Sequence, residues 1–90
     1  MARFEMNAAG LGGNAAAGTV DAAEMFELGL MYAAGREVAM DLIQAHKWFN
    51  LAAMRGNEAA RRYRSEIAGD LTRAEISKAQ RLAREWLSRR

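Results

Sequence analysis

Apolar and polar residues follow one another along this chain with the spacing of amphipathic helices. Apolar side chains recur every three or four positions, which places them on one face of an α-helix. The chain contains no proline, so glycine has to end the helices. The pattern predicts an all-α fold of four helices, and their short connections imply antiparallel neighbours. The helices are expected from Asp21 to about Ala34, from Leu42 to about Arg55, from Asn57 to Gly69, and from Thr72 to about Leu87.

Residues that can cap helices stand at the expected ends. Asp21 with Glu24, and Thr72 with Glu75, have the spacing of capping boxes, in which each side chain satisfies a backbone amide of the other residue. The remaining expected caps are Asp41 and Asn57 at helix starts, and Gly35, Gly56 and Gly69 just past helix ends.

The chain divides into three parts. Residues 1–20 form a Gly/Ala-rich segment that is expected to be flexible, because glycine costs the most backbone entropy to order. Residues 21–56 hold the first two helices, and residues 57–90 hold the last two. In an alternative arrangement, the first segment folds back onto a neighbouring apolar surface. The residues that would make this contact are Phe4, Met6, Leu11 and Val20.

A spaced set of small, aromatic and acidic residues lies within residues 28–56. It reads L-G-x-x-Y-x-x-G, then a short loop with Val and Asp, then A-x-x-W-x-x-x-A-A-x-x-G. Small residues let two helices approach closely, so Gly29 is expected beneath Trp48 or another large side chain. The members of the set are Leu28, Gly29, Tyr32, Gly35, Val38, Asp41, Ala45, Trp48, Ala52, Ala53 and Gly56.

This set resembles a Sel1-like repeat, a relative of the tetratricopeptide repeats (TPR). The resemblance covers residues 23–60, and residues 74–87 are similar to the helical ending that follows the last such repeat in bacterial proteins. It implies right-handed, TPR-like antiparallel helical hairpins, with one repeat over residues 21–56 closed by a helical cap over residues 57–90. It also implies a protein-binding adaptor.

Two departures from the repeat pattern affect this interpretation. Glu24 stands where the repeat usually has alanine, and Glu37 replaces the second loop glycine, so the loop can follow a different backbone path. The pattern also does not recur after Asn57, although helical solenoids usually need about three repeats to bury a continuous core. The chain therefore has one repeat and a cap.

The residues give no support for catalysis, a metal site or a cofactor. Cysteine is absent and His46 is the only histidine, so the three or four ligands that zinc requires cannot be assembled from these residue types. No phosphate-binding loop motif occurs, and the paired carboxylates of Glu24 and Glu27 fit the polar side of an amphipathic helix. We therefore expect a protein that is not an enzyme.

Charge is distributed unevenly along the chain. Residues 55–90 hold ten Lys/Arg against five acids, whereas residues 1–54 hold three against six. A basic surface on the last two helices would allow salt-sensitive binding to nucleic acid, which is the alternative function. Pairs such as Glu58 with Arg62 offer a simpler explanation, because oppositely charged residues four apart stabilise a helix. Nucleic acid is thus the less favoured partner.

No apolar run approaches the roughly 20 residues that a membrane-spanning helix needs. The N-terminus lacks the basic start and apolar core of a secretory signal. We therefore expect a soluble, cytoplasmic protein without a membrane partner.

Two surfaces are candidates for binding a protein or peptide. The first helix is apolar nearly all round, so a surface with no evident internal partner remains on it, and self-association as a homodimer through this helix is the favoured form. The second helix carries a mixed stripe opposite its small-residue face, which Ala45, Phe49 and Ala52 form. The stripe is suited to reversible contact, although packing against the third helix could also cover it. The candidate residues are Phe26, Leu30 and Met31 on the first helix, and Ile43, Lys47, Asn50 and Met54 on the second.

Overall fold

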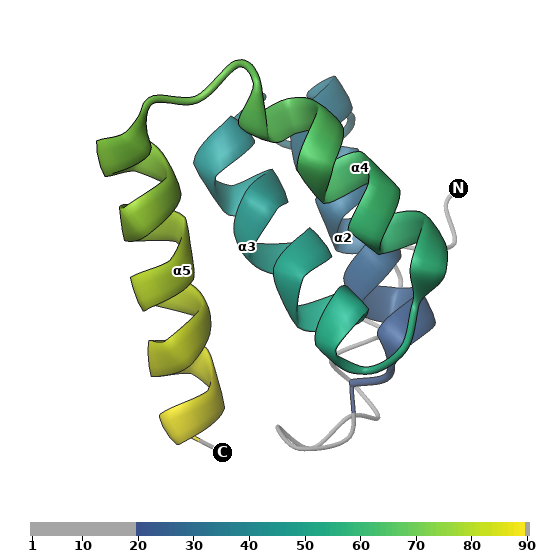
Figure 1. Cartoon of the computed structure of the whole chain (residues 1–90). Coiled ribbons are helices and arrows are strands. Elements are labelled where there is room, and N and C mark those ends of the chain that lie inside the picture. Colours follow the sequence, from purple (N-terminus) through teal and green to yellow (C-terminus); the bar gives the residue numbers. More distant parts are fainter. Residues whose placement is uncertain (1–19, 90) are drawn as a thin grey trace.

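The computed structural model describes residues 20–89, and these residues form four α-helices without a strand. The all-α prediction is confirmed, and the observed helix ends lie within one or two residues of the expected ones. The helices are α2 (Ala22–Ala34), α3 (Leu42–Met54), α4 (Glu58–Ala68) and α5 (Arg73–Ser88) (Figure 1).

Both predicted capping boxes are present. At the start of α2, Asp21 Oδ1 accepts from the Glu24 amide at 2.9 Å, and Glu24 Oε1 accepts from the Asp21 amide at 3.0 Å. Thr72 and Glu75 exchange the same two bonds at the start of α5, at 3.1 and 2.8 Å. Each pair satisfies backbone amides that a helix end would otherwise leave unpaired, which explains why these starts can be located from the sequence.

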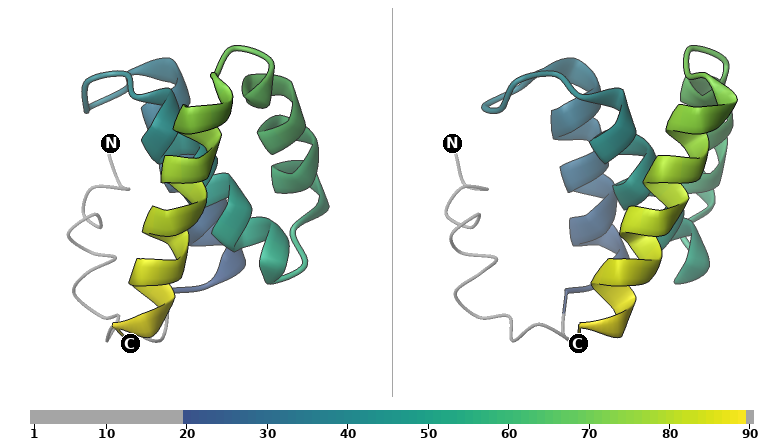
Figure 2. Two further views of the ribbon diagram at one scale, coloured as in Figure 1. Left: turned by 60° about the vertical axis from the view of Figure 1, so that its left-hand side comes forward. Right: turned by 90° about the vertical axis from the view of Figure 1, so that its left-hand side faces the viewer.

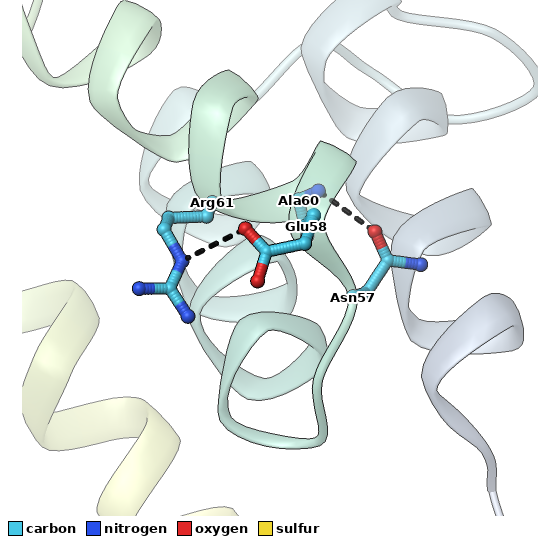
Figure 3. A network of polar contacts seen from close by, with 4 residues as sticks. All are labelled: Asn57, Glu58, Ala60 and Arg61. Carbon is cyan, nitrogen blue, oxygen red and sulfur yellow. Dashed lines mark hydrogen bonds and ion pairs between the residues drawn. The ribbon is translucent and has the colours of Figure 1, made fainter.

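The start of α4 combines a cap with an ion pair (Figure 3). The side chain of Asn57 accepts from the Ala60 amide at 2.8 Å, and the Glu58 carboxylate lies 3.5 Å from Arg61 Nε. Asp41 caps α3 in the same way, by accepting from the Ile43 and Gln44 amides. All four predicted N-caps are therefore confirmed.

The three glycines predicted just past helix ends stand there but differ in backbone conformation. Gly35 and Gly56 have φ values of 70° and 97°, the left-handed conformation that glycine adopts without a Cβ clash. Gly69 directly follows Ala68, the last residue of α4, as predicted, but its φ of −66° continues the right-handed path. The amides of Asp70 and Leu71 donate to carbonyls three residues back instead, which tightens the last turn of α4.

Glu37, where the repeat pattern has its second loop glycine, also lies in the left-handed region, with φ 68°. Outside glycine this conformation costs roughly 1–2 kcal/mol, because Cβ approaches the following carbonyl oxygen. Position 37 therefore keeps a backbone conformation that glycine favours, although the residue there is glutamate.

Helix α3 is the central element of the described fold. It packs against α2, α4 and α5, and in two further views it runs between α2 on one side and α4 on the other (Figure 2). Helices α4 and α5 diverge from the loop that joins them, and α3 is seen between them (Figure 1). Each of these two helices therefore relies on α3 for most of its packing.

The closest helix approach occurs where Gly29 of α2 meets α3. A Cβ atom placed on Gly29 would lie 2.5 Å from two ring carbons of Phe49, far inside van der Waals contact. Phe49 is fully buried. The predicted close approach at Gly29 is thus confirmed with Phe49 as the large side chain. Trp48 turns instead toward α5, where its ring lies edge-on to Trp86 with centroids 5.6 Å apart.

No helix within residues 20–89 is long and apolar enough to cross a membrane.

Candidate protein-binding surface

The candidate residues on α2 are largely occupied by contacts within the chain. The ring of Phe26 packs against Phe49 and Tyr63, with centroids 5.8 and 5.5 Å apart. Leu30 is half-buried and packs on the core, and only 6% of Met31 is exposed. These contacts leave α2 with less free apolar surface than its sequence indicates.

Four residues of the N-terminal segment were predicted as an alternative cover for a neighbouring apolar surface. Three of them, Phe4, Met6 and Leu11, lie outside the described residues. Val20 is described, and it packs against the core. Its carbonyl oxygen also accepts from Arg55 Nη1 at 3.0 Å, which joins the start of α2 to the end of α3.

Three consecutive residues of α3 contact three different helices. Trp48 meets Trp86 of α5, Phe49 meets Gly29 of α2, and Asn50 accepts a hydrogen bond from Arg64 of α4. Successive residues of an α-helix are turned by about 100°, so these contacts fix the direction of every face of α3.

The predicted stripe on α3 falls on the side that points away from α2, between the contacts to α4 and α5. Its members lie within about 60° of one another around the helix axis. Met54 is 60% exposed, and the other members are half-buried. We call this surface the α3 strip, and it consists of Ile43, Lys47, Asn50 and Met54.

Lys47 is held on the α5 side of the α3 strip. Its Nζ lies 4.4 Å from the centre of the Trp48 ring and 3.5 Å from Gln44 Oε1. Burial lowers the pKa of the Lys47 ammonium below its ordinary value, and the positive charge of Arg89 lowers it further. The charge of Lys47 is thus partly desolvated and balanced only by a ring face and an amide oxygen.

Arg64 supplies a second cation on the α4 side of the α3 strip. Its Nη1 donates to Asn50 Oδ1 at 2.6 Å, and its side chain is half-buried. This bond joins residues 14 positions apart in the sequence, on different helices. From the sequence, Arg64 is only one of the ten Lys/Arg of residues 55–90 that the nucleic-acid alternative uses, because no local pattern shows that it reaches α3.

His46 lies beside this pair, on the face of α3 turned toward α4. It is 3% exposed, and its Nδ1 has no hydrogen-bond partner among the described residues. Burial lowers the pKa of the His46 imidazole, and the nearby Arg64 charge lowers it further. The ring therefore stays neutral at pH 7.

Lowering the pH through about 6.5, the ordinary pKa of histidine, is expected to destabilise the fold through His46. The folded-state pKa lies below that value, so the unfolded chain binds a proton that the folded chain excludes, and the free energy of unfolding falls with pH. The slope is at most about 1.4 kcal/mol per pH unit for one proton. Urea denaturation between about pH 7.5 and 5.5 measures it, and His46→Leu should flatten the profile. Equal slopes for both proteins would contradict this assignment.

The ion pairs among the described residues do not include Lys47 or the cations beside the α3 strip. The three pairs are Arg36 with Glu27 at 3.9 Å, Arg61 with Glu58 at 3.5 Å, and Arg81 with Glu85 at 3.7 Å. All of them are solvent-exposed, where an ion pair contributes about 0–1 kcal/mol. In the part of the chain that the structure describes, no carboxylate lies within 4.0 Å of Lys47, Arg64 or Arg89.

The described residues contain no group of three or more His, Cys, Asp or Glu side chains that could hold a metal ion. Comparison of the chain with protein-family models, curated proteins and solved structures finds no match.

Proposed function

We propose that this protein is a small, non-enzymatic interaction module that binds a protein or peptide on the α3 strip. In this proposal its helices form right-handed hairpins of the Sel1-like, TPR-related type, and it acts as an adaptor in the cytoplasm.

The α3 strip carries the proposal. Helix α3 contributes the fully buried Phe49 and Leu51 to the core, yet one side of it keeps the exposed Met54 and the half-buried Ile43. Methionine adapts its shape to different partners, and apolar residues beside polar ones are common in reversible interfaces. A partner seated there would gain apolar burial without rearranging the core.

The Sel1-like assignment is supported by the residues that carry the resemblance. Gly29 allows α2 to approach α3 closely, Gly35 and Gly56 adopt left-handed conformations, and Ala45 and Ala52 are fully buried. The structure therefore gives physical reasons for small residues at these positions, and the repeat pattern has small residues at the same positions.

Nucleic-acid binding is the second candidate, favoured by exposed cations on α4 and α5. Arg62, Arg73, Lys78 and Arg84 are exposed and have no ion-pair partner in the described chain. Binding through such residues would weaken steeply with added salt, because counterions are released from the phosphates. Binding on the α3 strip would depend less on salt, since part of it is apolar.

Photo-crosslinking tests the proposed function. A photoreactive amino acid placed at Met54 should give discrete protein adducts in cells, and the adducts should survive nuclease treatment. The same amino acid at Arg62, which is exposed on the outer face of α4, provides the matched control and should give few or none. Nuclease-sensitive adducts, or adducts at Arg62 alone, would favour the nucleic-acid alternative and exclude the α3 strip.

The same experiment identifies self-association, since a second copy of the chain would give an adduct of twice its mass. Light scattering after size exclusion then measures the oligomeric state. If a dimer forms through α2 instead of α3, Leu30→Glu should dissociate it, whereas Met54→Glu should not.

A further inference from the structure

We propose that the partner of the α3 strip is an acidic peptide segment whose carboxylates pair with Lys47 and Arg64. This proposal rests on the proposed function and specifies the chemistry of the partner.

The positive charge at the α3 strip is unbalanced. Lys47 and Arg64 are both half-buried, and their polar contacts are with the neutral groups of Gln44 and Asn50. Removing a charge from water costs free energy unless an opposite charge replaces the lost hydration. A carboxylate that approaches these two cations recovers that cost, whereas a neutral or basic partner would increase it.

The central helix also lacks acidic residues. Helix α3 carries Lys47 and His46 but no Asp or Glu, and the exposed Arg89 adds its field to that of Lys47. On the outer faces, Arg61 and Arg81 are paired with Glu58 and Glu85. The other cations there, such as Arg62 and Arg84, are exposed to water. The α3 strip is therefore the part of the described surface where positive charge is least compensated relative to its burial.

The two cations stand at neighbouring positions of the strip. Lys47 and Asn50 are three residues apart on α3, which places their Cβ atoms roughly 5–6 Å apart. Arg64 donates to Asn50, so a cation stands at each of these two positions. Two glutamates at positions i and i+4 on one face of a helical peptide have a similar Cβ spacing, so that one can approach each position.

The apolar members of the strip favour a peptide over a nucleic acid. Ile43 and Met54 stand on either side of the cations along α3 and can bury the apolar side chains of an amphipathic segment. A phosphate backbone has no such groups to offer. The expected ligand therefore combines glutamates with leucines or similar residues on one helical face.

A labelled peptide tests the proposal by fluorescence anisotropy with the full chain. The probe is a short helical peptide with glutamates at i and i+4 and leucines beside them, and the control peptide carries glutamine in place of each glutamate. We expect the wild type to bind the glutamate peptide at least about tenfold more tightly than the glutamine peptide.

Matched variants locate the binding site. Lys47→Met with Arg64→Met removes two charges at nearly constant volume, and binding of the glutamate peptide should weaken at least about tenfold. Arg62→Met with Arg84→Met removes two exposed charges from the outer faces, and binding should change less than about twofold, because exposed charges contribute little. The thermal melt of each variant verifies that it is folded.

The Trp48 ring provides a measurement that needs no variant. Lys47 lies against this ring, so a carboxylate that draws the ammonium away should change the tryptophan fluorescence of the wild type. The glutamine peptide should leave the fluorescence unchanged.

Three results would overturn the proposal: equal binding of both peptides, equal loss in both double variants, or strip-dependent binding of an oligothymidylate in preference to the glutamate peptide. Adducts at Met54 with no preference for the acidic peptide would reject the acidic partner and leave the protein-binding function standing. Absence of adducts at Met54 would contradict the proposed protein-binding function as well.

Discussion

Phe49→Ala is expected to remove a large part of the free energy that stabilises the fold. Phe49 is fully buried and its ring contacts Gly29, Phe26 and Tyr63, so its removal leaves a cavity shared by three helices. Truncation of a buried phenylalanine costs about 3–5 kcal/mol, and a small domain has only about 5–15 kcal/mol in total. Circular dichroism during heating and urea denaturation measure the loss.

Met54→Ala is the matched control on the same helix. Its side chain is 60% exposed, and a surface substitution usually changes stability by less than about 0.5 kcal/mol. A Phe49→Ala protein that melts cooperatively near the wild-type temperature would show that Phe49 does not hold the helices together.

Gly29→Leu is expected to destabilise the fold through the opposite change in volume. A Cβ atom on Gly29 would already lie 2.5 Å from the Phe49 ring, and this ring cannot move away easily because Tyr63 stacks on it with centroids 5.5 Å apart. Overpacking a close contact costs about 1–3 kcal/mol or more, which exceeds the roughly 0.8–1 kcal/mol gained by replacing a glycine inside a helix. Urea denaturation gives the change in the free energy of unfolding.

Two companion variants separate this mechanism from a general intolerance of substituted glycines. Gly69→Ala should be tolerated, because the added Cβ would meet the Glu66 carbonyl oxygen at an ordinary 3.5 Å and the backbone is right-handed. Gly29→Ala with Phe49→Leu should cost less than the two single changes together, since a smaller side chain on α3 makes room for the methyl group. Strict additivity would mean that the two residues do not contact each other.

The sequence predicted the helices well because the information that defines them is local. Thr72 and Glu75 are three residues apart, and their reciprocal hydrogen bonds form within one turn of backbone. The same holds for Asp21 and Glu24. Gly69 shows the limit of this reasoning, since a glycine permits a left-handed helix end without requiring one.

The contact beneath Gly29 depended on the rotation of α3, which the sequence defines less well. Trp48 and Phe49 are adjacent, so their side chains diverge by about 100° and only one can face α2. The helical period placed Phe49 with Ala45 and Ala52 on the small-residue face, whereas the repeat pattern drew attention to Trp48. The structure follows the helical period at this position.

Only the part of the candidate surface that lies on α3 could be predicted from the sequence. Ile43, Lys47, Asn50 and Met54 share one side of α3 because a helix repeats every 3.6 residues. Two of the cations beside it come from other parts of the chain. Arg64 bonds to Asn50, and the charge of Arg89 acts on Lys47, only once the chain has folded. Burial of Met31 and the packing of Phe26 likewise depend on neighbours distant in the sequence.

The position of α3 also determines how the molecule opens. Helices α2, α4 and α5 each pack on α3, so the backbone amides of α3 can exchange with solvent only when several interfaces separate together. The outer helices can fray one at a time, whereas exchange in α3 reports the global unfolding free energy. A ligand bound to the α3 strip would slow the exchange of every amide that opens only by global unfolding, including such amides on helices that it never touches.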